Sequence, residues 1–216
     1  MVNFGNFWYD TVICQEGETI LHYPNGKKNN GMHQLSATNR SMRFSNRGMT
    51  LEKDINATNT FYRDRNKAVI HKKPTPVQIV NVHYPKRSAA VITEGYFKQP
   101  STTDYNGLYR GRHIDFEAKE TKNKTRFPLA NIHEHQIKHM KSITDHGGIC
   151  FLIIRFSAHD ETYYLPTESF FPFWDKQFNG GKKSIRYETV KDKGYLIPFH
   201  FQARVDYLSI IDQLYF

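Results

Sequence analysis

Apolar residues recur every three or four positions in two parts of the chain, which is the period of an amphipathic helix. The first part covers about 47–63, with a stripe made of Leu51, Ile55, Thr58 and Tyr62. The second part covers 131–145 and stops at Gly147-Gly148, because glycine readily ends a helix. The pattern therefore predicts two helices separated by a long stretch of other structure.

Shorter apolar and alternating segments predict β-strands. The run Ile149–Phe156 is almost continuously apolar, as expected for a central strand that is buried on both faces. The segments 77–83 and 88–97 are rich in β-forming residues and meet at a basic tip, so they predict a projecting hairpin. Further strands are predicted at 68–70, 102–105, 113–119 and 162–165.

Together these elements predict an α/β fold, with a mixed central sheet flanked by helices and a β-hairpin stalk at about 72–98. The 216 residues suit one globular domain with appendages. No apolar run approaches the roughly 20 residues of a membrane-spanning helix, and residues 1–20 contain no recognisable secretory signal. The chain has only two cysteines, too few for a disulfide framework. We therefore expect a cytoplasmic protein without membrane association.

Positive charge is grouped along the chain. Lys and Arg number 30 against 21 Asp and Glu, which gives a net charge of +9. Residues 21–50 contain five cations and no acid, and residues 63–87 contain seven cations against Asp64 alone. A solvated surface explains most charge runs, but two successive clusters almost free of acids favour a nucleic acid partner. A third cluster consists of Lys176, Lys182, Lys183 and Arg186.

The same charge distribution predicts the organisation of the chain. Residues 22–45 contain basic, polar and small residues with little to bury, so we interpret them as a flexible basic arm. Residues 1–21 form an extra N-terminal extension to which we assign no function. The folded domain is expected at 46–216.

The strand at 113–119 is the most informative segment for chemistry. Because side chains alternate along a strand, Ile114 and Phe116 share one face, while Asp115, Glu117 and Lys119 share the other. An ordinary half-exposed strand would show the same pattern. However, the turn dipeptide Asn106-Gly107 could fold the preceding strand back, so that Asp104 meets Glu117.

Two carboxylates and an ammonium group at one place predict metal-dependent phosphodiester hydrolysis. Mg²⁺ prefers oxygen ligands, and Asp104 and Glu117 would hold it against the scissile phosphate. Lys119 would orient the attacking water or stabilise the transition state. Gln136, the one polar member of the second helical stripe, would face either the metal or a structural hydrogen-bond partner.

Other reactive side chains suggest less. His133-Glu134-His135 and His139 do not have the spacing of a zincin site, because the second histidine is misplaced. We assign these histidines to the surface or core of the helix. Nothing in the sequence argues for a low pKa at Cys14.

Asp104 followed by Glu117-Ala118-Lys119 resembles the Asp…Glu-x-Lys signature of restriction-endonuclease-like nucleases. Longer motifs make the chain similar to the RecU family of Holliday-junction resolvases, from about residue 23 to the carboxy terminus. These motifs are 23–27 (YPNGK), 46–49 (NRGM), 71–76 (HKKPTP), 84–87 (YPKR), 101–107 (STTDYNG), 114–121 (IDFEAKET), 127–129 (FPL) and 133–136 (HEHQ).

The resemblance implies a restriction-endonuclease-like fold and a homodimeric endonuclease that cuts four-way DNA junctions symmetrically in recombination and repair. It implies Mg²⁺, with Mn²⁺ as a substitute, and a nucleoid-associated protein that also modulates the RecA recombinase. The implied metal ligands are Thr102, Asp104, Glu117 and Gln136, with Lys119 as transition-state stabiliser. The DNA contacts that we predict are Arg47, Lys72, Lys73, Lys86, Arg87 and Phe97.

Phe97 and its neighbour Tyr96 could stack on unpaired bases, although we expect at least one of them to pack in the core. Two alternatives to a junction resolvase remain open at this point. One is another nuclease of the same superfamily, and the other is a DNA-binding or RecA-modulating protein without catalysis.

Overall fold

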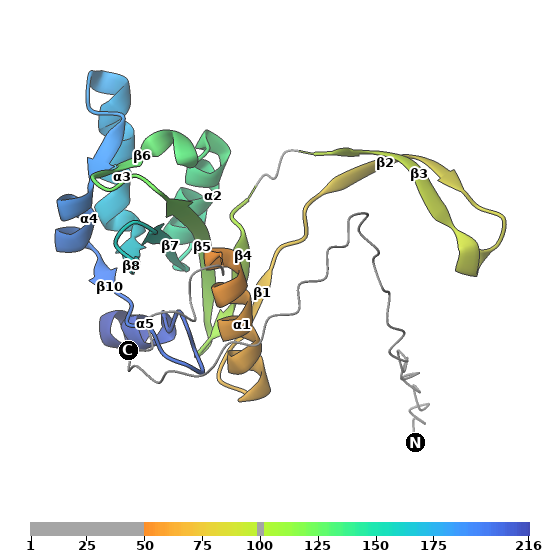
Figure 1. Ribbon diagram of the computed structural model, residues 1–216, viewed down its shortest axis with the longest axis horizontal. Helices are drawn as coiled ribbons and strands as arrows, with labels where there is room; N and C mark the ends of the chain where they lie inside the picture. Colours follow the sequence, from red (N-terminus) through yellow and green to blue (C-terminus); the bar gives the residue numbers. More distant parts are fainter. Residues whose placement is uncertain (1–49, 99–101) are drawn as a thin grey trace, which may run out of the picture. The chain divides into compact units, whose positions relative to one another are not determined.

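The computed structural model describes residues 50–98 and 102–216. The predicted extension at 1–21, the basic arm at 22–45 and the candidate DNA contact Arg47 lie outside these residues. Within them, a six-stranded mixed sheet forms the centre of the fold (Figure 1). Its strands, in spatial order, are β1 (Val69–Lys72), β4 (Tyr105–Tyr109), β5 (Arg112–Thr121), β7 (Ile149–Phe156), β8 (Glu161–Pro166) and β10 (Tyr195–Leu196).

Neighbouring strands of this sheet are antiparallel except β5 and β7, which are parallel. Parallel neighbours need a crossover connection, and the helix α2 (Glu134–Asp145) lies in that connection. The helix begins three residues later than predicted. The preceding residues form a short 3₁₀ turn, η2 (Leu129–Asn131), and His133 is the extended N-cap.

Helices cover both faces of the sheet. On one face, α1 (Leu51–Asp64) and α5 (Leu208–Tyr215) share a core with Phe116 and Phe151. On the other face, α2, α3 (Thr167–Lys176) and α4 (Tyr187–Lys193) share a core with Leu152. The strand β7 contributes side chains to both cores, which explains its continuous apolar sequence. The predicted mixed sheet flanked by helices is confirmed.

Two smaller elements complete the α2 side of the sheet. The strands β6 (Arg126–Pro128) and β9 (Ser184–Arg186) pair as a separate antiparallel sheet, and each buries one apolar residue in the α2-side core. The 3₁₀ turn η3 (Gln177–Asn179) follows α3. No helix in residues 50–98 and 102–216 is long and apolar enough to cross a membrane.

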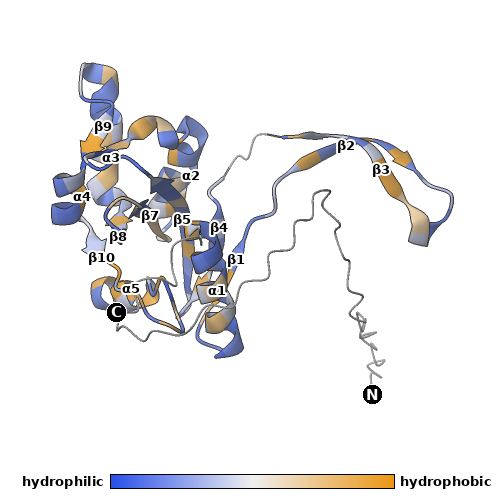
Figure 2. Cartoon of the chain, in the orientation of Figure 1, coloured by the Kyte–Doolittle hydropathy of each residue, from blue (hydrophilic) through white to orange (hydrophobic). Residues whose placement is uncertain are grey.

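The predicted hairpin is confirmed as a second two-stranded sheet, formed by β2 (Val77–His83) and β3 (Val91–Phe97) around the turn η1 (Arg87–Ala89). Every residue of β2 is exposed, so the hairpin contributes nothing to either core. Apolar residues lie along both of its strands, as the orange segments in Figure 2 show, and their side chains are exposed. Phe97 is 84% exposed and Tyr96 is 60% exposed, so the prediction that one of them packs in the core was wrong.

The predicted turn at Asn106-Gly107 was also wrong. Both residues lie inside β4, which starts at Tyr105 and not at Thr102. The chain reverses at Arg110 and Gly111, whose φ angles of 47° and 75° fit a two-residue type I′ turn. The strand still folds back on β5 as predicted, but four residues later.

Gly107 serves a steric purpose, which leads to a stability prediction. A Cβ at Gly107 would lie 2.0 Å from the carbonyl oxygen of Val69 in β1, whereas one at Gly111 would meet nothing within 4 Å. We expect Gly107→Ala to destabilise the protein by about 3 kcal/mol or more through overpacking. Gly111→Ala should cost only about 1 kcal/mol, from its left-handed backbone. Urea unfolding of both variants tests this, and equal losses would contradict it.

Candidate active site

The two carboxylates of β5 point toward α2 and are buried. Asp115 and Glu117 are opposite Cys150 and Leu152 of β7, and these partners belong to the α2-side core. The exposed fractions of Asp115 and Glu117 are 1% and 0%. The predicted alternation along β5 is confirmed. The carboxylates, however, lie in the protein interior, where an unpaired charge is costly.

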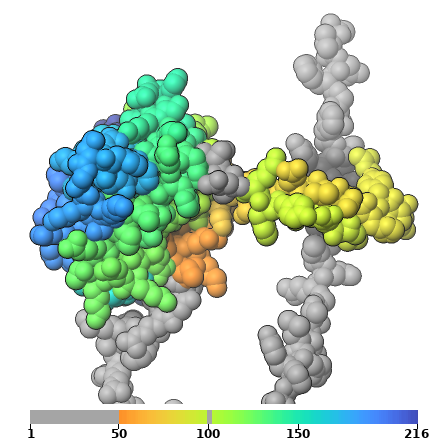
Figure 3. Space-filling view, turned by 90° about the horizontal axis from the view of Figure 1, so that it is seen from above, coloured from red at the N-terminus to blue at the C-terminus, as the bar shows by residue number. Residues whose placement is uncertain are grey.

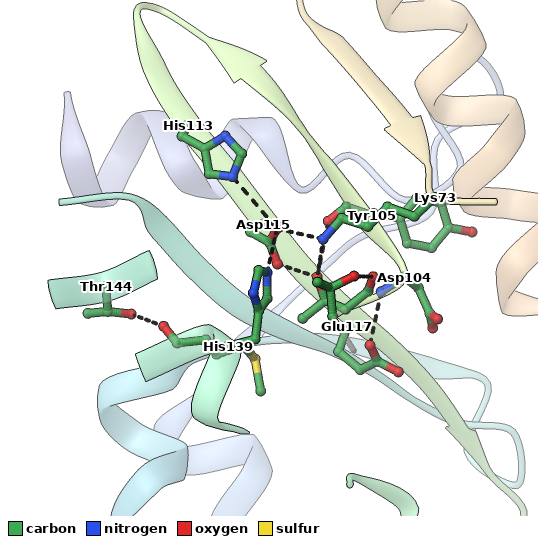
Figure 4. Close-up of polar contacts among 11 residues, drawn as sticks. Lys73, Asp104, Tyr105, His113, Asp115, Glu117, His139 and Thr144 are labelled. Carbon is green, nitrogen blue, oxygen red and sulfur yellow. Dashed lines mark hydrogen bonds and ion pairs between the residues drawn. The ribbon is translucent and has the colours of Figure 1, made fainter. Parts of the chain in front are cut away.

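Asp104 lies beside Glu117, as the sequence predicts. The residue immediately precedes β4, whose first residue, Tyr105, is opposite Phe116 of β5. The backbone N–H of Asp104 donates to Glu117 Oε2 at 3.0 Å (Figure 4). Lys119 Nζ lies 2.5 Å from Glu117 Oε1 and forms an ion pair with it. The structure therefore brings Asp104, Glu117 and Lys119 together.

The acidity of Glu117 reflects these surroundings. Burial raises the pKa of Glu117 to about 7, and the nearby Asp104 carboxylate adds to the rise. The Lys119 ammonium opposes it. One cationic side chain is thus insufficient to give this carboxylate an ordinary pKa.

The other two predicted ligands lie on the elements that flank this group. Thr102 is two residues before Asp104 and is partly exposed. Gln136 is in the first turn of α2 and is 4% exposed. Its Oε1 accepts a hydrogen bond of 2.9 Å from the backbone N–H of His133, so this side chain caps its own helix. This contact is a structural hydrogen bond, but its partner is the start of the same helix and not the strand end that the sequence suggested.

Sequence reasoning missed the role of Asp115, which joins several segments through its side chain (Figure 4). Its Oδ2 lies 2.8 Å from Lys73 Nζ and 3.2 Å from His139 Nε2, and its Oδ1 accepts a hydrogen bond from Thr103 Oγ1. His113 Nε2 is 3.6 Å from Oδ2. The only signal in the sequence was that Asp115 shares a strand face with Glu117.

Among the predicted DNA contacts that the structure describes, Lys73 differs from the rest because its side chain points inward. Besides Asp115, its ammonium donates to Thr103 Oγ1 at 3.0 Å, and its backbone N–H donates to the carbonyl of Asp104 at 2.8 Å. Its neighbour Lys72 instead forms a surface ion pair with Glu52 at 2.5 Å. Three further candidates are exposed on the hairpin, namely Lys86, Arg87 and Phe97.

The histidines at the start of α2 and within it make other contacts. Within the described ranges, no three His, Cys, Asp or Glu side chains are arranged to hold an ion. The rings of His133 and His135 stack with centroids 5.4 Å apart, while His139 contacts Asp115. His133 is exposed and His135 and His139 are partly exposed, which agrees with the assignment of these histidines to the helix surface or core.

Comparison with known proteins identifies the family of the chain. The family model described as RecU, recombination protein U, matches residues 46–213. The chain belongs to the RecU family. A protein named Holliday junction resolvase RecU from Oceanobacillus iheyensis is 64% identical over 196 residues, which cover 91% of this chain and 100% of the relative. The protein of the same name from Bacillus subtilis is 58% identical over 200 residues, 91% of this chain and 96% of the relative.

A solved structure of the Holliday junction resolvase Hjc from Archaeoglobus fulgidus is also similar to this RecU chain. It is 8% identical, covers 62% of this chain and 92% of its own chain, and has a TM-score of 0.36. This similarity is too low to support a conclusion about the site. The RecU assignment therefore depends on the family model and the sequence relatives.

The raised pKa of Glu117 in this RecU protein gives a test of the site without metal. The folded state holds the Glu117 proton up to about pH 7, whereas the unfolded state loses it near 4.5. The folded state therefore binds more protons in this window, so stability should fall by up to about 3 kcal/mol as pH rises through it. Glu117→Gln should remove this dependence.

The measurement is urea unfolding in EDTA at pH 4.5 and pH 8, for wild type and Glu117→Gln. Because other groups also titrate, the quantity of interest is the difference between the two proteins at each pH. We expect the variant to gain stability relative to wild type at pH 8. If the difference in unfolding free energy between the two proteins is the same at pH 4.5 and pH 8, the raised pKa of Glu117 is contradicted.

Proposed function

We propose that this chain is a structure-selective endonuclease that resolves four-way DNA junctions during homologous recombination and DNA repair. The single observation that carries the proposal is the buried Glu117 held between Asp104 and Lys119 on adjacent segments. The relatives named Holliday junction resolvase RecU support the substrate, since they match this chain over nearly their whole length.

The residues of the site fit a hard divalent cation. Mg²⁺ and Mn²⁺ accept carboxylate, hydroxyl, carbonyl and amide oxygens as donors. Burial, with the nearby Asp104 carboxylate, keeps the pKa of Glu117 raised even though Lys119 pairs with it, so added positive charge would stabilise the ionised form. We propose that Thr102, Asp104, Glu117 and Gln136 hold Mg²⁺, or Mn²⁺ as a substitute. When bound, such a cation makes a water more acidic and neutralises charge on the phosphate.

The side chains themselves have separate tasks in hydrolysis. Lys119 is fixed beside Glu117, so its ammonium can orient an attacking water and stabilise negative charge that develops on the phosphate. A preorganised donor of this kind contributes roughly 10²–10³ in rate. Asp115 does not belong to the predicted ligand set. Through Thr103 and Lys73 it fixes the segment that carries Asp104.

DNA affinity would come from phosphate contacts outside this site. The exposed cations Lys86 and Arg87 near the hairpin tip, with Lys72 and Arg47, would contact the backbone of the junction. Phe97 is exposed and free to stack on a base. Symmetric cleavage needs two sites related by a twofold axis, so we propose a homodimer. A cytoplasmic, nucleoid-associated location and modulation of the RecA recombinase complete the proposal.

Cleavage of a mobile four-way junction is the direct test. In Mg²⁺, the wild-type protein should cut the junction much faster than a linear duplex of equal sequence. Asp104→Asn should lower the cleavage rate by at least about 10³-fold, while it leaves junction binding in place. Gel assays of cleavage and fluorescence anisotropy of binding measure the two effects.

The outcomes distinguish the alternatives. Equal cleavage of junction and duplex would favour another nuclease of the superfamily. Binding without cleavage by wild type would favour a non-catalytic DNA-binding protein. Cleavage that survives Asp104→Asn would show that the site is misassigned.

Lys72 and Lys73 offer a matched pair of variants, because they are adjacent and carry the same charge. Lys72→Gln should weaken DNA binding and lower the slope of log K against log salt by about 0.9, the value for one phosphate contact. Lys73→Gln should leave that slope unchanged and lower kcat, because Lys73 bonds Asp115 and Thr103 in the interior. A lowered salt slope in Lys73→Gln would instead support its predicted DNA contact.

A further inference from the structure

We propose that a basic pocket at the β6–β9 sheet binds the sugar-phosphate backbone of a duplex arm of DNA. The pocket has a volume of about 550 Å³. We call it the β6–β9 pocket, and its lining residues are Lys124, Thr125, Arg126, His159, Arg186, Tyr187 and Glu188. The proposal rests on the proposed function for the choice of DNA as the polyanion. None of the DNA contacts predicted above lies in this pocket.

Two positive charges lie side by side at the pocket, although this arrangement does not stabilise the fold. Arg126 and Arg186 stand directly opposite one another in the β6–β9 ladder, an arrangement that is destabilising for like charges. Their neighbours Phe127 and Ile185 are buried, so both arginines occupy the opposite, exposed face of this small sheet. An anion between the two guanidinium groups would relieve the repulsion.

Acidic side chains do not neutralise this pair. Across the described residues, Lys124, Arg126 and Arg186 take part in no ion pair, and the polar contact of the Arg126 guanidinium is Ser184 Oγ at 3.4 Å. Glu188 is the one acid that lines the pocket. Glu161 lies nearby, but its Oε2 accepts hydrogen bonds from the hydroxyls of Tyr163 and Tyr187.

The wall of the pocket is held in place before any ligand arrives. The rings of His159 and Tyr187 stack with centroids 4.3 Å apart, and His159 Nε2 lies 2.7 Å from the carbonyl oxygen of Lys124. Asn123 Oδ1 accepts hydrogen bonds from the backbone N–H groups of Thr125 and Arg126. The loop that carries Lys124 is thus fixed to the turn between β7 and β8 by His159. It is also fixed to the start of α4, because the backbone N–H of Tyr187 donates to the carbonyl oxygen of Thr125 at 2.8 Å. This order lowers the entropy lost on binding.

The pocket lies on the same side of the sheet as the candidate active site. Phe127 and Ile185 pack in the α2-side core, toward which Glu117 also points. From Glu117 the strand β5 continues to Thr121, about 13 Å at roughly 3.3 Å per residue, and the pocket loop follows directly. Residues 124–126 and 186–188 line one pocket, and in Figure 3 a green surface borders a blue one on the folded domain.

The place of the pocket beyond the end of β5 favours a duplex as the occupant. A DNA duplex carries one charge per roughly 1.7 Å of its axis, so a duplex with a phosphate at Glu117 presents further phosphates along its arm. We therefore assign the pocket to the arm that flanks the cleaved strand. Its contacts would add affinity and orientation without reading sequence.

The test is the salt dependence of binding to a plain linear duplex, measured in EDTA with the full chain carrying Asp104→Asn. Arg126→Gln/Arg186→Gln should lower the slope of log K against log salt by about 1.8, the value for two phosphate contacts. The Kd near 0.1 M salt should rise roughly tenfold or more. The conservative double change to lysine should restore most of the slope.

A matched control removes the same two charges elsewhere. Arg65→Gln/Arg110→Gln neutralises exposed arginines at the end of α1 and in the β4–β5 turn, at the opposite end of β5. The slope of log K against log salt for this control should change by less than about 0.5, because the two arginines lie outside the pocket and affect DNA only through the net charge of the protein. Urea unfolding should show that Arg126→Gln/Arg186→Gln is at least as stable as the parent protein.

Equal slopes for the two double variants would overturn the proposal, as would an effect confined to single-stranded DNA. These failures are separate from failure of the proposed function. If wild type cleaves the junction but Arg126→Gln/Arg186→Gln leaves the salt slope of duplex binding unchanged, the pocket proposal alone is wrong. If the double variant lowers that slope but wild type never cleaves, the nuclease proposal is wrong and the duplex-binding pocket is supported.

Discussion

The structure of the site depends on the burial of two carboxylates two residues apart on one face of β5. Asp115 and Glu117 are almost completely removed from water, so each needs compensation from the protein or from a ligand. Asp115 receives it from Lys73, Thr103 and His139, which come from three other segments. Glu117 receives one ammonium and one backbone N–H, and its pKa remains raised.

The compensation of Asp115 organises the surroundings of Glu117. Lys73 precedes the hairpin, Thr103 precedes Asp104, and His139 lies on the helix that also carries Gln136. Because one buried carboxylate binds all three, a displacement of any of these segments would expose or unpair the charge. The segment before the hairpin and the segment before β4 are therefore held against β5 by the same interaction. Lys73 adds a backbone hydrogen bond to Asp104.

The sequence was sufficient where local periodicity decides structure. The period of two in 113–119 predicted the faces of β5, and the continuous apolar run predicted β7 as a strand buried on both faces. It failed at Asn106-Gly107, since this dipeptide is common in turns, whereas Gly107 is needed for close approach to β1. The bonds of Lys73 and His139 to Asp115 arise from tertiary packing, and no spacing along the chain encodes them.

The contrast between the two carboxylates explains why adjacent positions of one strand face have different roles. A carboxylate that the protein already satisfies with Lys73 and His139 has little to gain from a cation and serves to hold the segments in place. A carboxylate beside a second acid, with one lysine, gains much more from added positive charge. The site is thus rigid at Asp115 and short of positive charge at Glu117. Positive charge added at Glu117 would therefore lie beside a segment that the bonds of Asp115 already hold against β5.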